Sequence, residues 1–211
     1  MRMGKRVQII DRAVVLDCEF LTDTGAPGRF WCGPRDPDPI VFQIGAVALS
    51  LTGDFAIDGT FHRLILPVGR DGQEAELSEL AQNLTGISNA DLQGQGVSLA
   101  QAYDDFAGWL QADKVWSWGK DELNLMAISS YVAGIAPPVP VTRFDNACRL
   151  LLKAGMPYED LAKTRSNTLA AYFDLDTAHL RGHDARDDAM SVALTLQHLL
   201  RQGRLLASDF T

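Results

Sequence analysis

The chain has few cysteines, no long apolar run and no excess of positive charge. Its three cysteines, Cys18, Cys32 and Cys148, are scattered and form no Cys-x-x-Cys pair, which argues against a disulfide framework and against a zinc site. No stretch approaches the roughly 18–20 apolar residues of a membrane span. Residues 1–11 are polar and basic and lack the apolar segment of a signal peptide. We therefore expect a cytoplasmic protein with no membrane partner.

The charge balance is acidic, with a formal net charge of −8. Long-range attraction to phosphate needs a basic face, so this balance argues against a protein that coats nucleic acid nonspecifically. With 211 residues and 46% hydrophobic content, the chain can build one sizeable core. We expect a single domain over 1–211, with its functional core at about 13–200.

Apolar and turn-forming residues alternate in a way that predicts both strands and helices. Strands are expected at 13–20, 40–49, 60–66, 114–118 and 141–144, the first three as a meander. Helices are expected at about 76–84, 98–111, 121–132, 145–154, 166–173 and 184–201. The segment 23–39 is rich in glycine and proline and is expected to be a long loop. Phe30 and Trp31 lie at its centre, where they either stack on a nucleobase or pack onto the domain.

Acidic residues stand where the pattern predicts burial. Asp17 and Glu19 close the first apolar run, and alternate residues of a strand share a face, so both carboxylates point the same way. Such crowding is unfavourable unless a proton or a cation relieves it, and oxygen ligands suit Mg²⁺ or Mn²⁺. Asp121 begins a predicted helix after a buried strand; Glu122 is a weaker competitor for the same role.

A further pair lies near the predicted last helix. Asp188 precedes Val192 by one helical turn and so falls on the apolar side, whereas Asp187 points about 100° away and is expected to be solvated. His183 stands five residues before Asp188, at or just before the helix start. Gly182 gives this histidine a flexible approach to a reaction centre.

Taken in order, these motifs resemble those of the DEDDh 3′–5′ exonucleases, which include RNase T, the proofreading subunit of a bacterial replicative polymerase, and the histone-mRNA and KapD-like exonucleases. The segments Ile44-Gly45-Ala46-Val47 and Leu84-Thr85-Gly86-Ile87 also fit the family pattern. The resemblance implies an α/β, RNase H-like mixed sheet of about five strands flanked by helices. It covers nearly the whole chain. The Trp116 to Trp118 segment is most similar to the histone-mRNA and KapD-like branch.

The resemblance also implies a catalytic set, which is Asp17, Glu19, Asp121, His183 and Asp188. The four carboxylates would hold two ions, Mg²⁺ or Mn²⁺, with Asp17 bridging them and Asp121 binding largely through water. His183 would act as general base. The expected activity is metal-dependent hydrolysis of single-stranded RNA or DNA from the 3′ end, releasing nucleoside 5′-monophosphates. A homodimer is left open, as in RNase T-like relatives.

Three other interpretations were compared with this one. The first is a catalytically weak exonuclease-like module that binds nucleic acid or a partner, and the second is a polymerase-associated proofreading subunit. The third rests on Asp174, Asp176 and the Asp187-Asp188 pair, which imitate motifs of haloacid-dehalogenase-type phosphatases. In that family the nucleophilic aspartate ends the first strand and a whole domain follows it. Because only a short tail follows here, we interpret Asp174 and Asp176 as turn or helix-end residues.

Overall fold

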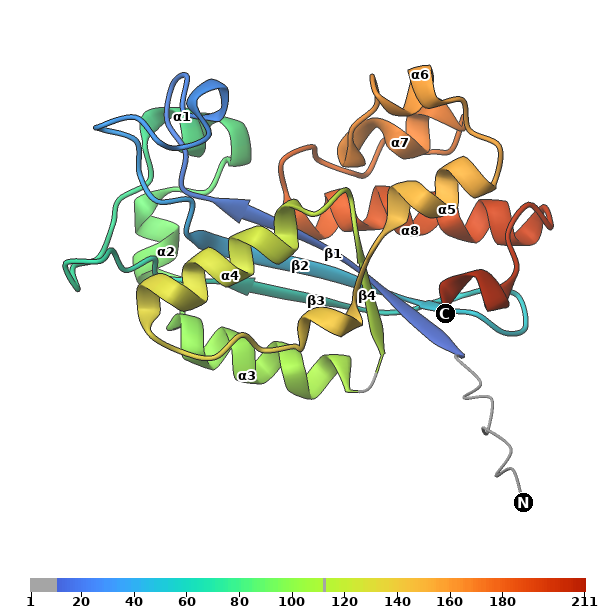
Figure 1. The fold of residues 1–211 in the computed structure, drawn as a ribbon, viewed down its shortest axis with the longest axis horizontal. Coiled ribbons are helices and arrows are strands. Elements are labelled where there is room, and N and C mark those ends of the chain that lie inside the picture. The colour runs from blue at the N-terminus through green and yellow to red at the C-terminus, as the bar shows by residue number, and fades with distance from the viewer. Residues whose placement is uncertain (1–10, 112) are drawn as a thin grey trace.

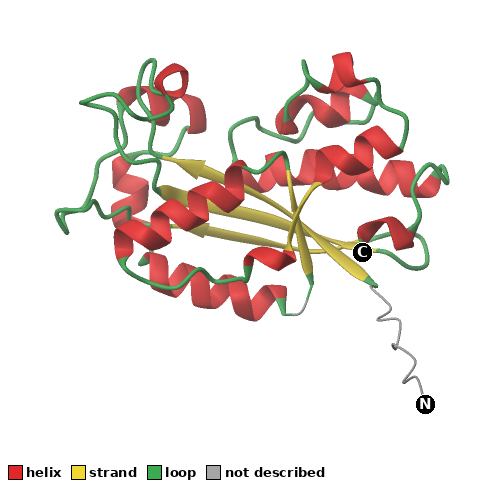
Figure 2. Cartoon of the chain, in the orientation of Figure 1, coloured by secondary structure: helices red, strands yellow, loops and turns green. Residues whose placement is uncertain are grey.

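A computed structural model describes residues 11–111 and 113–211, which form a five-stranded sheet with helices on both faces (Figures 1 and 2). The strands are β1 (Arg12–Phe20), β2 (Val41–Ser50), β3 (Ile57–Leu64), β4 (Lys114–Ser117) and β5 (Phe144–Asn146). Their order across the sheet is β3-β2-β1-β4-β5. The first three strands form the predicted antiparallel meander, while β4 runs parallel to β1 and β5 parallel to β4. The prediction of a mixed sheet of about five strands is confirmed.

Strand β1 lies in the middle of the sheet and is covered on both faces, which explains its nearly continuous apolar sequence. Val14, Leu16 and Cys18 face one core cluster, whereas Ala13 and Val15 face the other. The alternation continues to the end of the strand, so that Asp17 and Glu19 share the face of Val15.

The helices are α1 (Glu79–Thr85), α2 (Asn89–Gln95), α3 (Leu99–Leu110), α4 (Asp121–Ala133), α5 (Ala147–Lys153), α6 (Tyr158–Leu161), α7 (Ser166–Tyr172) and α8 (Ala185–Arg201). Helices α3 and α4 cover one face of the sheet, and α8 packs on β1 and β2 from the other, with α7 and α5 against α8. None of the helices in the described ranges is long and apolar enough to cross a membrane.

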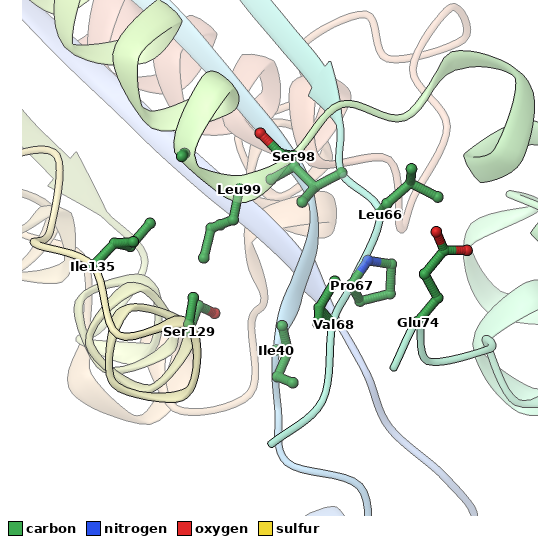
Figure 3. A pocket seen from close by; sticks show the side chains of 12 residues that line it. Ile40, Leu66, Pro67, Val68, Glu74, Ser98, Leu99, Ser129 and Ile135 are labelled. Atoms are coloured by element: carbon green, nitrogen blue, oxygen red, sulfur yellow. The ribbon is translucent and has the colours of Figure 1, made fainter. Parts of the chain in front are cut away.

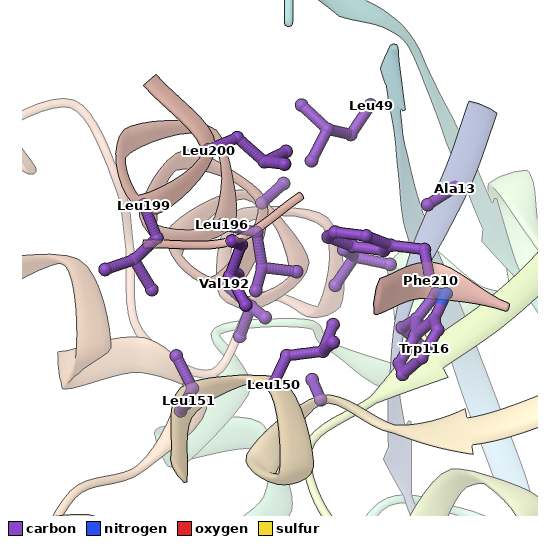
Figure 4. Close-up of a cluster of buried hydrophobic side chains, with 14 of the residues drawn as sticks. Ala13, Leu49, Trp116, Leu150, Leu151, Val192, Leu196, Leu199, Leu200 and Phe210 are labelled. Atoms are coloured by element: carbon purple, nitrogen blue, oxygen red, sulfur yellow. The ribbon is translucent and has the colours of Figure 1, made fainter. Parts of the chain in front are cut away.

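The core beneath α8 is built by the apolar stripe expected from the sequence. Val192, Leu196 and Leu199 are almost fully buried, and the closing turn of the chain brings Phe210 edge-on to Trp116 of β4 (Figure 4). Burying four such side chains stabilises the fold by roughly 1.5–3 kcal/mol each. This packing fixes the position of α8 on the sheet.

Two parts of the structure differ from the sequence expectations. The predicted strand 141–144 is instead a 3₁₀ turn, Val141–Arg143, followed by β5, because Pro140 sets up a turn and the ladder begins only at Phe144. Helices α2 and α6 were not predicted. The start of α2 carries a Ser88–Asp91 capping box, but Gly94 and Gly96 weaken the helical pattern that follows it.

Candidate active site

The five side chains of the predicted catalytic set line a single cavity of about 400 Å³. Asp17 and Glu19 come from the end of β1, and Asp121 begins α4, which follows β4. Because β1 and β4 are parallel neighbours, their carboxyl ends meet at one edge of the sheet. His183 and Asp188 reach the same edge from the loop before α8 and from the first turn of that helix.

The start of α8 lies directly on the backbone of β2. A Cβ atom added at Gly45 would lie 2.0 Å from the backbone nitrogen of Arg186, so only glycine permits this approach. Gly45 stands opposite Asp17 in the β1–β2 ladder. The Ile44-Gly45 motif is therefore what allows Asp188 to come close to Asp17, and Asp188 is buried as predicted, at 5% exposure.

Gln43 fastens the same helix start to the sheet. Its Oε1 accepts a hydrogen bond from the Ala185 N–H at 3.1 Å, and its Nε2 donates to Asp184 Oδ2 at 3.1 Å. Nε2 also lies 3.0 Å from Nε2 of His62. Since the Gln43 amide nitrogen can only donate, His62 must accept with a neutral ring, and burial indeed lowers the pKa of His62. The sequence analysis missed Gln43, whose only signal is a polar residue inside a buried strand.

His183 lies just before α8, as expected, in a left-handed backbone conformation with φ of 61°. Its N–H donates to Asp188 Oδ2 at 3.3 Å, so one carboxylate ties the loop to the helix. A non-glycine residue in this region costs on the order of 1 kcal/mol or more and persists only when its surroundings hold it. The His183 side chain is exposed and lines the cavity.

The turn from β4 into α4 sets the position of Asp121. Gly119 has a φ of +78°, which favours glycine, and its N–H donates to Asn146 Oδ1 at 3.2 Å. Asp121 is the first residue of α4 and is exposed at the cavity, where the helix dipole stabilises a carboxylate. The next residue, Glu122, is buried and also lines the cavity.

Carboxylates crowd the cavity and change one another's acidity. Burial, followed by the charges of Glu122 and Asp188, raises the pKa of Asp17 well above its ordinary value. Burial and nearby carboxylates likewise raise the pKa of Glu19 to about 8, with Asp188 the largest of these charges. Burial is also the main cause that raises the pKa of Asp188 to about 7. These groups therefore retain protons near neutral pH unless a cation replaces them.

The donor set fits a divalent cation. Ligand atoms of Glu19, His183 and Asp188 lie within 4.8 Å of one another. Carboxylate oxygens are hard ligands of the kind that Mg²⁺ and Mn²⁺ prefer. Crowded, buried carboxylates whose pKa values are raised gain most from a bound cation. The residues present can therefore hold the metal that the sequence analysis expects.

Apolar and aromatic side chains complete the cavity wall. Trp31, Trp118 and Leu84 line it, and Trp31 packs edge-on to Phe20 with ring centroids 5.3 Å apart. Of the two loop aromatics, Trp31 thus packs onto the domain, whereas Phe30 beside it is 83% exposed. Gly86 of the Leu-Thr-Gly-Ile segment ends α1 in a left-handed conformation beneath the Arg181 guanidinium.

Of the basic residues that could bind phosphate, Arg165 lines the cavity together with Ser166 and Asn167. Arg149 pairs with Asp145, and Arg143 donates to a backbone carbonyl, so both serve structural contacts. Ser166 and Asn167 were not singled out by the sequence analysis. Ser166 slightly offsets the effect of burial, because its hydroxyl lowers the pKa of the Asp17 carboxyl.

Asp187 differs from its prediction. Its side chain is only 13% exposed, and it accepts hydrogen bonds from the Arg181 N–H and from the Arg186 guanidinium. It is absent from the cavity lining, as helical geometry requires, but it anchors the loop and is only partly exposed to solvent.

Another cavity, of about 380 Å³, lies between the segment that follows β3, the start of α3 and the end of α4, and has a mostly apolar wall (Figure 3). Its polar side chains are those of Glu74, Ser98 and Ser129. Ser129 already donates to the Leu125 carbonyl and accepts from the Val41 N–H. None of the five predicted catalytic residues lines this cavity.

Solved structures of exonucleases share this architecture. The chain is similar to a full-length 3′-exonuclease, with a TM-score of 0.75 and 15% identity over 98% of this chain and 66% of that one. It is also similar to E. coli exonuclease I in complex with a dT13 oligonucleotide, with a TM-score of 0.59 and 16% identity over 92% of this chain and 42% of that one. The fold is RNase H-like.

A third similar structure is the zinc-bound form of the E. coli exonuclease I complex with single-stranded DNA, with a TM-score of 0.59 and 15% identity over 95% of this chain and 42% of that one. The RNase H-like chain thus spans less than half the length of exonuclease I. No family model and no curated protein sequence matches it. The similarity therefore establishes the fold, and the activity has to be argued from the site.

Proposed function

We propose that this protein is a metal-dependent 3′–5′ exonuclease of the DEDDh type, which releases nucleoside 5′-monophosphates from single-stranded RNA or DNA. The observation that carries the proposal is the meeting of Asp17, Glu19, Asp121, His183 and Asp188 in one cavity, although they lie up to 171 positions apart in the sequence. A set that is scattered along the chain and joined by the fold is expected of a reaction centre.

Phosphodiester hydrolysis needs a nucleophile, an in-line approach and stabilisation of negative charge on the leaving 3′ oxygen. Two Mg²⁺ or Mn²⁺ ions, when bound, supply that charge stabilisation and orient the phosphate. Asp17, Glu19 and Asp188 would hold them, with Asp121 contributing from the cavity rim. Their crowding in the cation-free protein, described above, is the physical support for this assignment.

His183 would act as the general base. Its exposed ring lies at the cavity, and the bond from its N–H to Asp188 Oδ2 keeps the ring near the carboxylate cluster. A histidine takes up a proton readily near neutral pH, so it can deprotonate the attacking water. Removing a general base typically costs about 10²–10⁴-fold in rate.

The 3′ end of a single strand fits the remaining features of the cavity. Trp31, Trp118 and Leu84 offer flat or apolar surfaces to nucleobases, and Arg165 offers a cation to a phosphate. The similar structures of E. coli exonuclease I in complex with a dT13 oligonucleotide and with single-stranded DNA are consistent with such a ligand.

The test uses 5′-labelled single-stranded RNA and DNA of one sequence, incubated with Mg²⁺, Mn²⁺ or EDTA and resolved by length. We expect a metal-dependent ladder that shortens from the 3′ end and is absent with Asp17→Asn and Asp188→Asn. Asp187→Asn, which makes the same change of charge at the next position, should retain cleavage. Cleavage by Asp188→Asn at the unaltered rate would refute the site assignment. Binding without cleavage by the unaltered protein would favour a non-catalytic module, and co-purification with a polymerase would favour a proofreading subunit.

A further inference from the structure

Glu122 is a buried carboxylate that the five-residue set leaves unused. It is 5% exposed, and its Oε2 atom has no hydrogen-bond partner among the described residues. It lines the cavity that contains Asp17, Glu19 and Asp188. Burying an ionised carboxylate with one oxygen unpartnered is unfavourable, so such a group needs either a proton or a cation.

Helical geometry separates Glu122 from its neighbour. Consecutive residues of a helix point about 100° apart, and accordingly Asp121 is exposed at the cavity rim while Glu122 points inward. Asp17, which is 7% exposed, is buried in the same cavity as Glu122. The inner end of the cavity therefore concentrates negative charge around Asp17 and Glu122.

We propose that Glu122 is a ligand of the divalent cation on the Asp17 side of the cavity, in addition to the set that includes Asp121. This inference rests on the proposed metal-dependent function. A cation there satisfies the unpartnered Oε2 atom and relieves the repulsion between the two buried carboxylates at once. Asp121, which is exposed, then supports cation binding through a water molecule or through its negative charge at the rim of the cavity.

The alternative is that Glu122 is a permanently protonated acid with no part in cation binding. The two hypotheses predict different effects of a neutral side chain at position 122 on cation binding. Glutamine keeps the shape of glutamate but is a poorer ligand, so Glu122→Gln weakens cation binding if Glu122 is a ligand. If Glu122 stays protonated, glutamine replaces one neutral group by another and cation binding stays the same.

The experiment measures Mn²⁺ binding to the full chain without nucleic acid, by titration calorimetry and by the rise of the melting temperature with Mn²⁺ concentration. We expect Glu122→Gln to weaken Mn²⁺ binding by at least about tenfold. This is the lower end of the loss of metal affinity seen when a group that supports the direct ligands is removed. Glu122→Met, which fills the same buried space without a charge, should behave alike and covers the case in which glutamine perturbs folding. Asp121→Asn should weaken binding less.

Glu159→Gln serves as the matched control, because Glu159 is an exposed helical glutamate whose neutralisation changes the net charge equally. It should leave Mn²⁺ binding unchanged. Binding by Glu122→Gln within twofold of the unaltered protein, with binding lost in Asp188→Asn, would overturn this inference and leave the proposed function standing. An unaltered protein that shows no saturable Mn²⁺ binding would overturn both.

Discussion

Neutralising Asp188 should make the cation-free protein more stable while removing its activity. The carboxyl is 5% exposed, and burial raises its pKa from an ordinary value of 3.8 to about 7. Such a difference corresponds to about 4 kcal/mol of destabilisation once the group is ionised in the folded protein. Asparagine keeps an oxygen that can accept the His183 N–H and carries no charge, so Asp188→Asn removes this penalty.

The effect should depend on pH in a defined direction. The folded protein holds the Asp188 proton more tightly than the unfolded chain, so stability falls as pH rises from about 4 to about 7 and then levels off. Burial raises the pKa of Glu19 to about 8, which extends the fall to about pH 8. Asp188→Asn should therefore match the unaltered protein near pH 4 and exceed it above pH 8, by roughly 10 °C in melting temperature for a chain of this size.

The assay is thermal and urea unfolding in EDTA across that pH range. Asp187→Asn is the control, since it removes one charge from the adjacent residue, which faces Arg186 and not the cavity. Adding Mg²⁺ should raise the stability of the unaltered protein at pH 8 and have less effect on Asp188→Asn, because the cation relieves the same repulsion. If the melting temperatures of Asp188→Asn and of the unaltered protein changed in parallel with pH, the argument that burial destabilises the ionised Asp188 carboxylate would be refuted.

Three further substitutions test the surroundings of the cavity. Gly45→Ala should lower the free energy of unfolding by at least about 1–3 kcal/mol, because its Cβ would meet the α8 backbone; unaltered urea unfolding would contradict this. Gln43→Leu leaves the Ala185 N–H without its acceptor and should lower the free energy of unfolding by about 1–3 kcal/mol. It should also lower kcat more than it raises KM, and an unchanged kcat would argue against a positioning role. Phe30→Ala should leave thermal stability nearly unchanged and weaken binding of single-stranded oligonucleotides by about 1–3 kcal/mol in fluorescence anisotropy; equal affinity would show that the exposed ring does not stack on bases.

Local patterns in the sequence were sufficient for most of the elements. The central strand and the last helix have strong periodicities, and both were predicted to within one residue at each end. The predictions that failed concern short elements. Helix α6 has four residues and β5 has three, so neither can show a period, and their positions follow from turns such as the one after Pro140.

The acidic residues show the same division. Sequence alone put Asp17 and Glu19 on one face of a strand and Asp188 on the apolar side of a helix, because both periodicities are local properties of the backbone. It favoured Asp121 over Glu122 but could not tell which of them is buried, since both occupy the first turn of α4. Only the packing of that helix against the sheet exposes one and buries the other.

The sequence by itself thus determined the order of the long elements, the mixed sheet and the residue types of the proposed site. Tertiary structure decided which of these residues meet, because distances between segments depend on sheet order and on close approaches such as that of α8 to Gly45. It also decided the partners that support them, including Gln43 and Ser166. The physical reason is that periodicity acts over a few residues, whereas burial, hydrogen-bond partners and the repulsion among carboxylates arise only when distant segments pack together.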